Sequence, residues 1–203
     1  MENLFFDGET HTYYYKGDKV PCVSDILKMV DVITMVGIPI RNLEAAAERG
    51  TRVHQETEKL DYGEIDPQDE AWLQENADIA PYVIGYQNFL SVYPTLPIAR
   101  EEALYSKHYR YAGTLDLVKF IDGKIAIVDI KTSKTISELR SSLQLNAYRL
   151  LWNETHPDMQ ADDLYILQLD GDNGYRLFKV EVDAEQFYDV LILYKKIKGD
   201  RKL

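Results

Sequence analysis

Two apolar segments joined by Asp122-Gly123 constrain the fold of this 203-residue chain more than any other feature. Asp-Gly favours a two-residue β-hairpin turn, because both turn positions need a positive φ. The ranges 111–121 and 124–132 on either side carry apolar side chains such as Val118, Ile127 and Val128 and are typical of strands. The sequence therefore predicts two neighbouring antiparallel strands that contribute to a core.

Helical and strand-like patterns alternate along the rest of the chain. Helical spacing occurs at 24–30, 40–60, 82–93 and 137–154, in a segment after Pro67, and in a last segment that Asp183 is placed to cap. Strand patterns occur at 4–6, 12–15, 98–106, 164–169 and 175–180, with 16–18 as a turn. This order predicts an α/β fold with a small mixed sheet flanked by helices.

The length and composition fit one globular domain. No linker or internal repeat divides the 203 residues, which suit a single core. We expect one domain over 1–203, with an N-terminal hairpin and helices in 1–95 and a core that carries the chemistry in 96–203.

The cellular compartment is predicted from what the sequence lacks. No apolar run reaches the roughly 18 residues of a membrane span, and the first seven residues do not resemble a signal peptide. Cys22 is the single cysteine, so the sequence offers no disulfide and no cysteine cluster for zinc or iron–sulfur. A cytoplasmic protein without a membrane partner is the expectation.

The net charge of −11 argues against a phosphate-rich partner at first sight. Seven of those negative charges come from one stretch without Lys or Arg, which contains Asp61, Glu64, Asp66, Asp69, Glu70, Glu75 and Asp78. Other acids can surround a metal ion, which offsets their charge. The charge therefore neither excludes nor predicts DNA, and the acidic stretch 61–78 is a possible protein-binding segment.

The candidate chemistry lies at the ends of the two hairpin strands. Asp129 and Lys131 are two residues apart on one strand, so their side chains share a face, and the hairpin places them beside Asp116 on the other strand. Carboxylates and carbonyls are the ligands of hard divalent cations such as Mg²⁺. We expect Asp116, Asp129 and the Ile130 carbonyl to hold Mg²⁺ or Mn²⁺, and Lys131 to act on water or phosphate during phosphodiester hydrolysis.

Taken alone, an Asp-x-Lys tripeptide is weak support for this chemistry, because strands often end in charged residues at a solvated edge. The apolar residues that precede Asp129 make these strands core-forming. A charged pair at the end of such strands is less easily explained by solvation.

A family resemblance adds to this interpretation. Gly113-Thr114-Leu115-Asp116, Asp129-Ile130-Lys131-Thr132 and the pair Gln144 and Tyr148 resemble the RecB-like branch of the PD-(D/E)XK nucleases. Arg49-Gly50-Thr51-x-Val53-His54 is similar to a helical motif of this branch, and the segment 21–27 is similar to one in phage exonucleases and the mitochondrial genome-maintenance exonuclease. Cys22 stands where the family usually has serine. The resemblance implies a restriction-endonuclease-like core.

The resemblance also implies residue roles. His54 would be a further metal ligand, and Glu102 a further acidic ligand, with Glu101 a near-equal candidate. Gln144 and Tyr148, four apart on one helical face, would steady the lysine or the DNA. Arg52 and Arg140 would contact DNA. Because the sequence lacks the four cysteines of some relatives, the resemblance points to the sub-branch without an iron–sulfur cluster.

Several alternatives stay open. His54 and Tyr148 could be ordinary core residues, and Glu102 and Gln144 ordinary surface residues. The implied function is an exonuclease acting on DNA ends or single strands, bacterial or phage-encoded. An endonuclease or nickase with the same site, a catalytically silent nuclease-fold DNA-binding or interaction protein, and an unrelated α/β domain that mimics the motif are the rivals.

Overall fold

The computed structural model describes residues 3–8, 10–34 and 40–199, the side chains of 32–34 and 40–43 excepted. The strands are β1 (Leu4–Asp7), β2 (Thr12–Tyr15), β3 (Asp18–Val20), β4 (Ala99–Ser106), β5 (Tyr111–Ile121), β6 (Lys124–Lys131), β7 (Asp163–Leu169) and β8 (Tyr175–Val180). The helices are α1 (Val23–Thr34), α2 (Ile40–Asp61), α3 (Glu70–Glu75), α4 (Ala80–Val92), α5 (Glu138–Thr155) and α6 (Ala184–Lys198).

The central sheet has five strands in the order β4-β5-β6-β7-β8. Only β6 and β7 pair in parallel; the other neighbours are antiparallel. Parallel strands need a long crossover, and α5 forms it. The predicted α/β fold with a small mixed sheet flanked by helices is confirmed.

The predicted hairpin joins β5 and β6. Asp122 and Gly123 have φ values of 51° and 78°, the pair of positive values that a type I′ turn requires. The register runs from Ile121 opposite Lys124 to Leu117 opposite Val128. The hairpin thus brings the far ends of the two strands, with their charged residues, into proximity.

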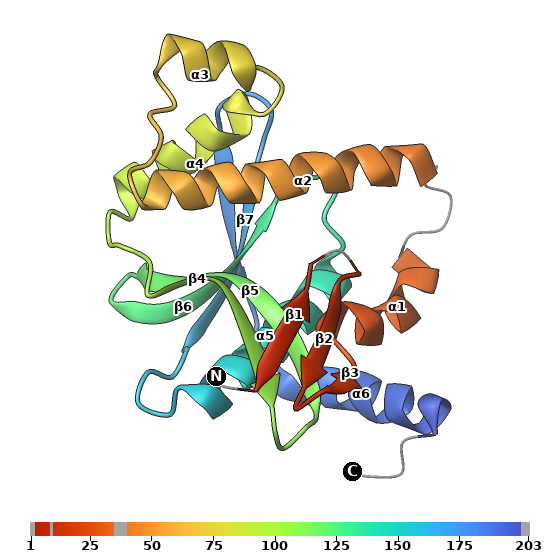
Figure 1. The fold of residues 1–203 in the computed structure, drawn as a ribbon. Helices are drawn as coiled ribbons and strands as arrows, with labels where there is room; N and C mark the ends of the chain where they lie inside the picture. The colour runs from red at the N-terminus through yellow and green to blue at the C-terminus, as the bar shows by residue number, and fades with distance from the viewer. Residues whose placement is uncertain (1–2, 9, 35–39, 200–203) are drawn as a thin grey trace.

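Helices cover both faces of the sheet (Figure 1). On one face, α1, α5 and α6 bury residues such as Ile26, Leu145 and Phe187 against Leu115. On the other face, α2 and α4 pack Val53 and other apolar residues against the sheet. The end of the hairpin that carries Asp116 and Asp129 therefore lies between two helical layers.

The N-terminal segment forms a three-stranded antiparallel sheet, β1-β2-β3, rather than the predicted hairpin. The turn consists of Lys16 and Gly17 only, so Asp18, predicted as part of the turn, pairs with Tyr15 and starts β3. This sheet packs on β4 and β5 through a small apolar cluster that includes Tyr13 and Tyr105.

In the part of the chain that the structure describes, no helix has both the length and the apolar character that a membrane crossing demands.

Candidate active site

Asp116 on β5 lies at the point where the ladder to β6 ends. Its buried carboxylate accepts a hydrogen bond from the Ile130 amide at 2.8 Å through Oδ2. Because Ile130 follows Asp129 directly, the expected convergence of the two strand ends is present in the backbone. The second oxygen of Asp116, Oδ1, points towards α2, where it lies 3.8 Å from Nδ1 of His54.

Asp129 and Lys131 form an ion pair next to α5. The Lys131 ammonium lies 2.7 Å from Oδ2 of Asp129 and donates to Oδ1 at 2.9 Å. Asp129 is 1 % exposed, and burial raises the pKa of its carboxyl, an effect that Lys131 opposes. Oδ2 of Asp129 is buried, and the Lys131 ammonium offsets its charge without an aligned hydrogen bond. A cation that took the place of this ammonium could coordinate the oxygen.

His54 reaches the site from α2. Its Nδ1 lies 3.0 Å from Oε1 of Glu101, and its Nε2 lies 3.1 Å from the Ile130 carbonyl oxygen. Burial lowers the pKa of His54, but Asp116 and Glu101 outweigh burial and raise it to about 9. Both ring nitrogens face acceptors, which matches the doubly protonated imidazolium. The imidazolium therefore supplies positive charge among the carboxylates, and it would have to release a ring proton before that nitrogen could bind a cation.

Glu101, rather than Glu102, joins this cluster. No register pair includes Glu101 or Asp116, and Glu101 has a φ of 43°. The alternation of side chains is broken there, because Arg100 contacts α2 through Thr57 and Glu101 contacts it through His54. Consecutive residues of β4 thus face the same helix.

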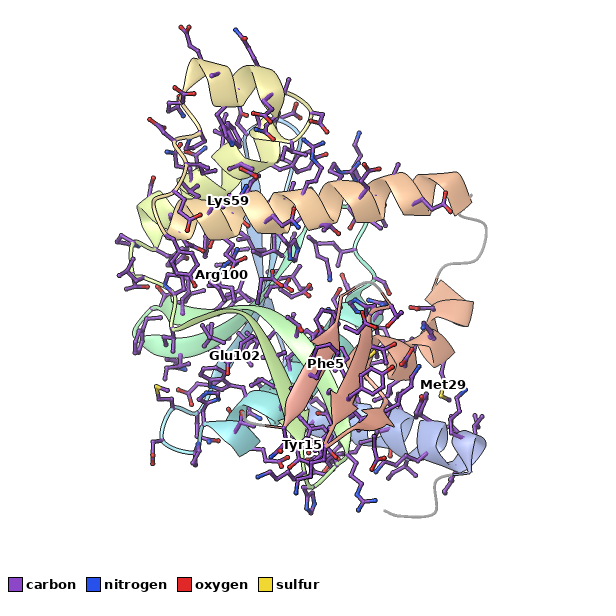
Figure 2. The ribbon with its side chains drawn as sticks, in the orientation of Figure 1. Phe5, Tyr15, Met29, Lys59, Arg100 and Glu102 are labelled. Carbon is purple, nitrogen blue, oxygen red and sulfur yellow. The ribbon has the colours of Figure 1, made fainter. Side chains whose placement is uncertain are left out.

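The side chain of Glu102, predicted first, lies on the other side of β4, away from α2 (Figure 2). There its carboxylate is 3.7 Å from Nε2 of His156, beyond the end of α5. The geometry differs from the expectation at this position, because the break in alternation turns Glu101 to the site and Glu102 away from it.

The ligand atoms suit a divalent cation. Among the described residues, His54, Glu101 and Asp116 each offer an atom within 4.8 Å of the others. Two carboxylates and an imidazole are ligands of Mn²⁺, and carboxylates also of Mg²⁺. Asp129, expected to share the ion with Asp116, lies outside this group and is paired with Lys131 instead.

Gln144 and Tyr148 lie on one face of α5, as predicted. The side-chain oxygen of Gln144 accepts from Lys131 at 3.3 Å and from Arg140 at 3.2 Å. Its amide nitrogen donates to the Tyr148 hydroxyl at 3.3 Å. Burial raises the pKa of Tyr148 well above its ordinary value, so the phenol stays neutral. Gln144 therefore connects the lysine to the helix that covers it.

The two arginines predicted to contact DNA are paired within the protein. Arg140 lies 2.5 Å from Asp31 of α1, and Arg52 forms two bonds to Asp78, at 2.5 and 3.1 Å. Asp78 belongs to the acidic stretch. DNA contact by either arginine stays a prediction and would require its ion pair to open.

The site opens into a cavity of about 780 Å³. Its walls come from the N-terminal sheet, α1, α2, α5 and strands β4 to β6, and include Tyr13, Gly50, Asp116, Lys131 and Tyr148. The Tyr13 hydroxyl lies 2.7 Å from the Thr114 hydroxyl and so attaches β2 to β5 beside Asp116. Tyr13 could not be identified as a site residue from the sequence, because it is 101 positions away from Thr114.

An acidic and imidazole cluster at the end of a central hairpin, next to an Asp–Lys pair, defines a candidate metal centre in an α/β fold. The family model described as the PD-(D/E)XK nuclease superfamily matches residues 36–193. The chain therefore belongs to the PD-(D/E)XK nuclease superfamily.

Two solved structures match the chain at low sequence identity. One, described as a "putative exonuclease" from Eubacterium rectale, is 15 % identical with a TM-score of 0.46, covering 77 % of this chain and 69 % of that chain. The second, SSO0001, is 13 % identical with a TM-score of 0.35, covering 74 % of this chain and 85 % of that chain. Among curated proteins, none matches the chain.

Proposed function

We propose that this protein is a divalent-metal-dependent deoxyribonuclease that hydrolyses phosphodiester bonds, as an exonuclease acting on DNA ends or single strands. The observation that carries the proposal is the cluster of His54, Glu101 and Asp116 within 4.8 Å, beside a buried Asp129–Lys131 pair. The exonuclease preference comes from the resemblance to RecB-like nucleases and is the finer part of the proposal.

The metal site would consist of Asp116, Glu101, His54 and the Ile130 carbonyl, with Asp129 added once Lys131 releases it. A bound Mg²⁺ or Mn²⁺ would polarise the scissile phosphate and lower the pKa of a water molecule. The contact between Lys131 and Oδ2 of Asp129 is an ion pair without an aligned hydrogen bond, which favours this exchange of partners.

Lys131 is the residue that we assign to the attacking water or the charged phosphate oxygens. Its ammonium is held between Asp129 and Gln144, so a shift away from Asp129 leaves it attached to α5. Gln144 in turn is bonded to Tyr148, and the neutral phenol can donate a hydrogen bond to a phosphate oxygen.

A nuclease assay tests the proposal. End-labelled linear and internally labelled circular single-stranded DNA are incubated with Mg²⁺, Mn²⁺ or EDTA. We expect metal-dependent degradation of the linear strand, a loss of about 100-fold or more in Lys131→Ala and Asp129→Asn, and full activity in Lys124→Ala, a control at the exposed start of β6. Full activity in both site variants would overturn the assignment.

The circular substrate separates the rivals. Dependence on a free end supports the exonuclease, whereas cleavage of the circle supports an endonuclease or nickase with the same site. Binding of DNA without cleavage in any metal would identify a catalytically silent nuclease-fold protein.

The exposed acids of the stretch 61–78 suit either exclusion of duplex DNA or a basic protein partner. Two acids of this stretch form ion pairs within the protein: Asp61 is buried against Arg100, and Asp78 pairs with Arg52. The variant Glu64→Gln/Glu70→Gln/Glu75→Gln neutralises exposed members of the stretch. Unchanged substrate choice together with unchanged partners would count against both roles.

A further inference from the structure

Four cationic side chains line one cavity at the turn end of the N-terminal sheet. The cavity has a volume of about 610 Å³ and is lined by Lys16, Lys19, Lys107 and Arg110, with Asp18 as the one acid. Four cations and one carboxylate leave a local net charge of +3, in a chain whose net charge is −11. Such a concentration of positive charge attracts phosphate groups.

Two turns from distant parts of the chain create this cavity. Lys16 has a φ of 53° in the turn between β2 and β3, and Arg110 has a φ of 56° in the turn between β4 and β5. The rings of Tyr15 and Tyr105 stack 4.0 Å apart at an interplanar angle of 18° and hold the two turns together. Tyr15 lies at the end of β2 far from α2 (Figure 2).

The four cations are available for a partner. Each is exposed, and no ion pair joins any of them to a carboxylate of the described chain, whereas Lys59, Arg52 and Arg140 are all paired. The Lys16 ammonium lies 5.7 Å from the centre of the Tyr15 ring. A phosphate backbone could therefore contact these side chains without breaking an internal ion pair.

The basic cavity adjoins the metal cleft. Tyr13 and Cys22 line the cleft, and Tyr15 and Pro21 line the basic cavity. Tyr111, which follows Arg110, and Asp116 are five residues apart on β5, a separation of about 17 Å at the rise of a strand and about that of five nucleotides in one DNA strand. A strand with its end in the cleft would thus place phosphates about five nucleotides from that end near the basic cavity.

We propose that the cavity lined by Lys16, Lys19, Lys107 and Arg110 binds the phosphate backbone of the DNA strand whose end occupies the metal cleft. The inference rests on the proposed nuclease function. Recognition is through charge and is independent of base sequence, so the N-terminal sheet acts as the surface that holds the strand during cleavage.

The test compares substrates that do and do not reach the cavity. The double variant Lys107→Gln/Arg110→Gln removes two cations, and Arg176→Gln/Lys196→Gln is the matched control, with exposed cations on β8 and α6. For a long single strand, we expect kcat/KM to fall about tenfold in the cavity variant and its dependence on salt concentration to weaken by about 1.4 in the log–log slope. Cleavage of a dinucleotide should be unchanged.

An unchanged salt slope in the cavity variant, or an equal loss in the control, would overturn the inference. Failure of the wild type to cleave either substrate would instead contradict the nuclease function. The cavity is then tested separately, by fluorescence anisotropy of a labelled single strand in EDTA. Weaker binding by the cavity variant than by the control supports the inference, and equal binding overturns it.

Discussion

Arg100 and Asp61 form an ion pair in the interior of the protein, 3.0 Å apart, with side chains 0 % and 1 % exposed. Arg100 also donates to the backbone carbonyls of Asp116, at 3.3 Å, and His54, at 3.4 Å. One guanidinium therefore joins α2 to the strand that carries Asp116, and Figure 2 shows Arg100 between α2 and the sheet.

Loss of this arginine should destabilise the protein and loosen the site. Arg100→Met leaves Asp61 buried without its cation, a change that costs about 3–5 kcal/mol, to be measured as the free energy of unfolding in urea. The double variant Arg100→Met/Asp61→Leu should regain most of that stability, because it removes the unpaired charge. Equal stability of the single and double variants would show that the pair does not act as a unit.

The two neighbouring glutamates should differ in metal binding. Glu101→Gln removes a carboxylate 3.0 Å from His54, so we expect Mn²⁺ binding measured by calorimetry to weaken by about tenfold or more. Glu102→Gln, whose side chain faces His156, should bind Mn²⁺ like the wild type. Weaker Mn²⁺ binding by Glu102→Gln than by Glu101→Gln would instead identify Glu102 as the ligand.

Metal addition should stabilise the folded protein. Mn²⁺ at 100 times its Kd should add about 2.7 kcal/mol to the free energy of unfolding, and EDTA should remove the gain. Asp116→Asn should abolish the effect. Asp122→Asn is the control, because asparagine tolerates the positive φ of this turn position in the same hairpin. Stabilisation that persists in Asp116→Asn would place the ion elsewhere.

The buried ammonium of Lys119 should make the stability of the protein depend on pH. Burial lowers its pKa to about 8, a shift that Asp61 opposes and Arg100 reinforces, and its ammonium donates to the Tyr93 carbonyl at 2.6 Å. The folded-state pKa lies below the value of about 10.4 in an unfolded chain, so between these values the unfolded state binds more protons. The contribution of Lys119 to the free energy of unfolding therefore rises as the pH rises through this window.

The variant Lys119→Met isolates that contribution. Near pH 7 the lysine is charged in both states and the full cost of burying the charge is present, so the variant should be more stable than the wild type. By pH 10 the difference should have shrunk, since the wild-type lysine has lost its proton. Urea denaturation at pH 7 and pH 10 measures the difference in free energy of unfolding between the variant and the wild type. An equal difference at the two pH values would contradict the burial of a charged Lys119.

Local sequence alone determined several elements of this fold. Asp122-Gly123 set a two-residue turn because its conformation depends on those two residues only, and the Asp183 carboxylate caps α6 by accepting from amides two and three residues ahead. The spacing of Asp129 and Lys131 likewise sufficed to place both on one face of β6. These features depend on neighbours in the chain, which the sequence displays directly.

Contacts between distant elements were decided only by the tertiary structure. The choice of Glu101 over Glu102 depends on where the β4–β5 ladder breaks, and the pairing of Arg52 with Asp78 depends on how α2 lies against the acidic stretch. The basic cavity exists because the stack of Tyr15 on Tyr105 joins turns 90 residues apart. Side-chain periodicity is a local property, whereas register and packing are set by the balance of many contacts, and no short motif encodes that balance.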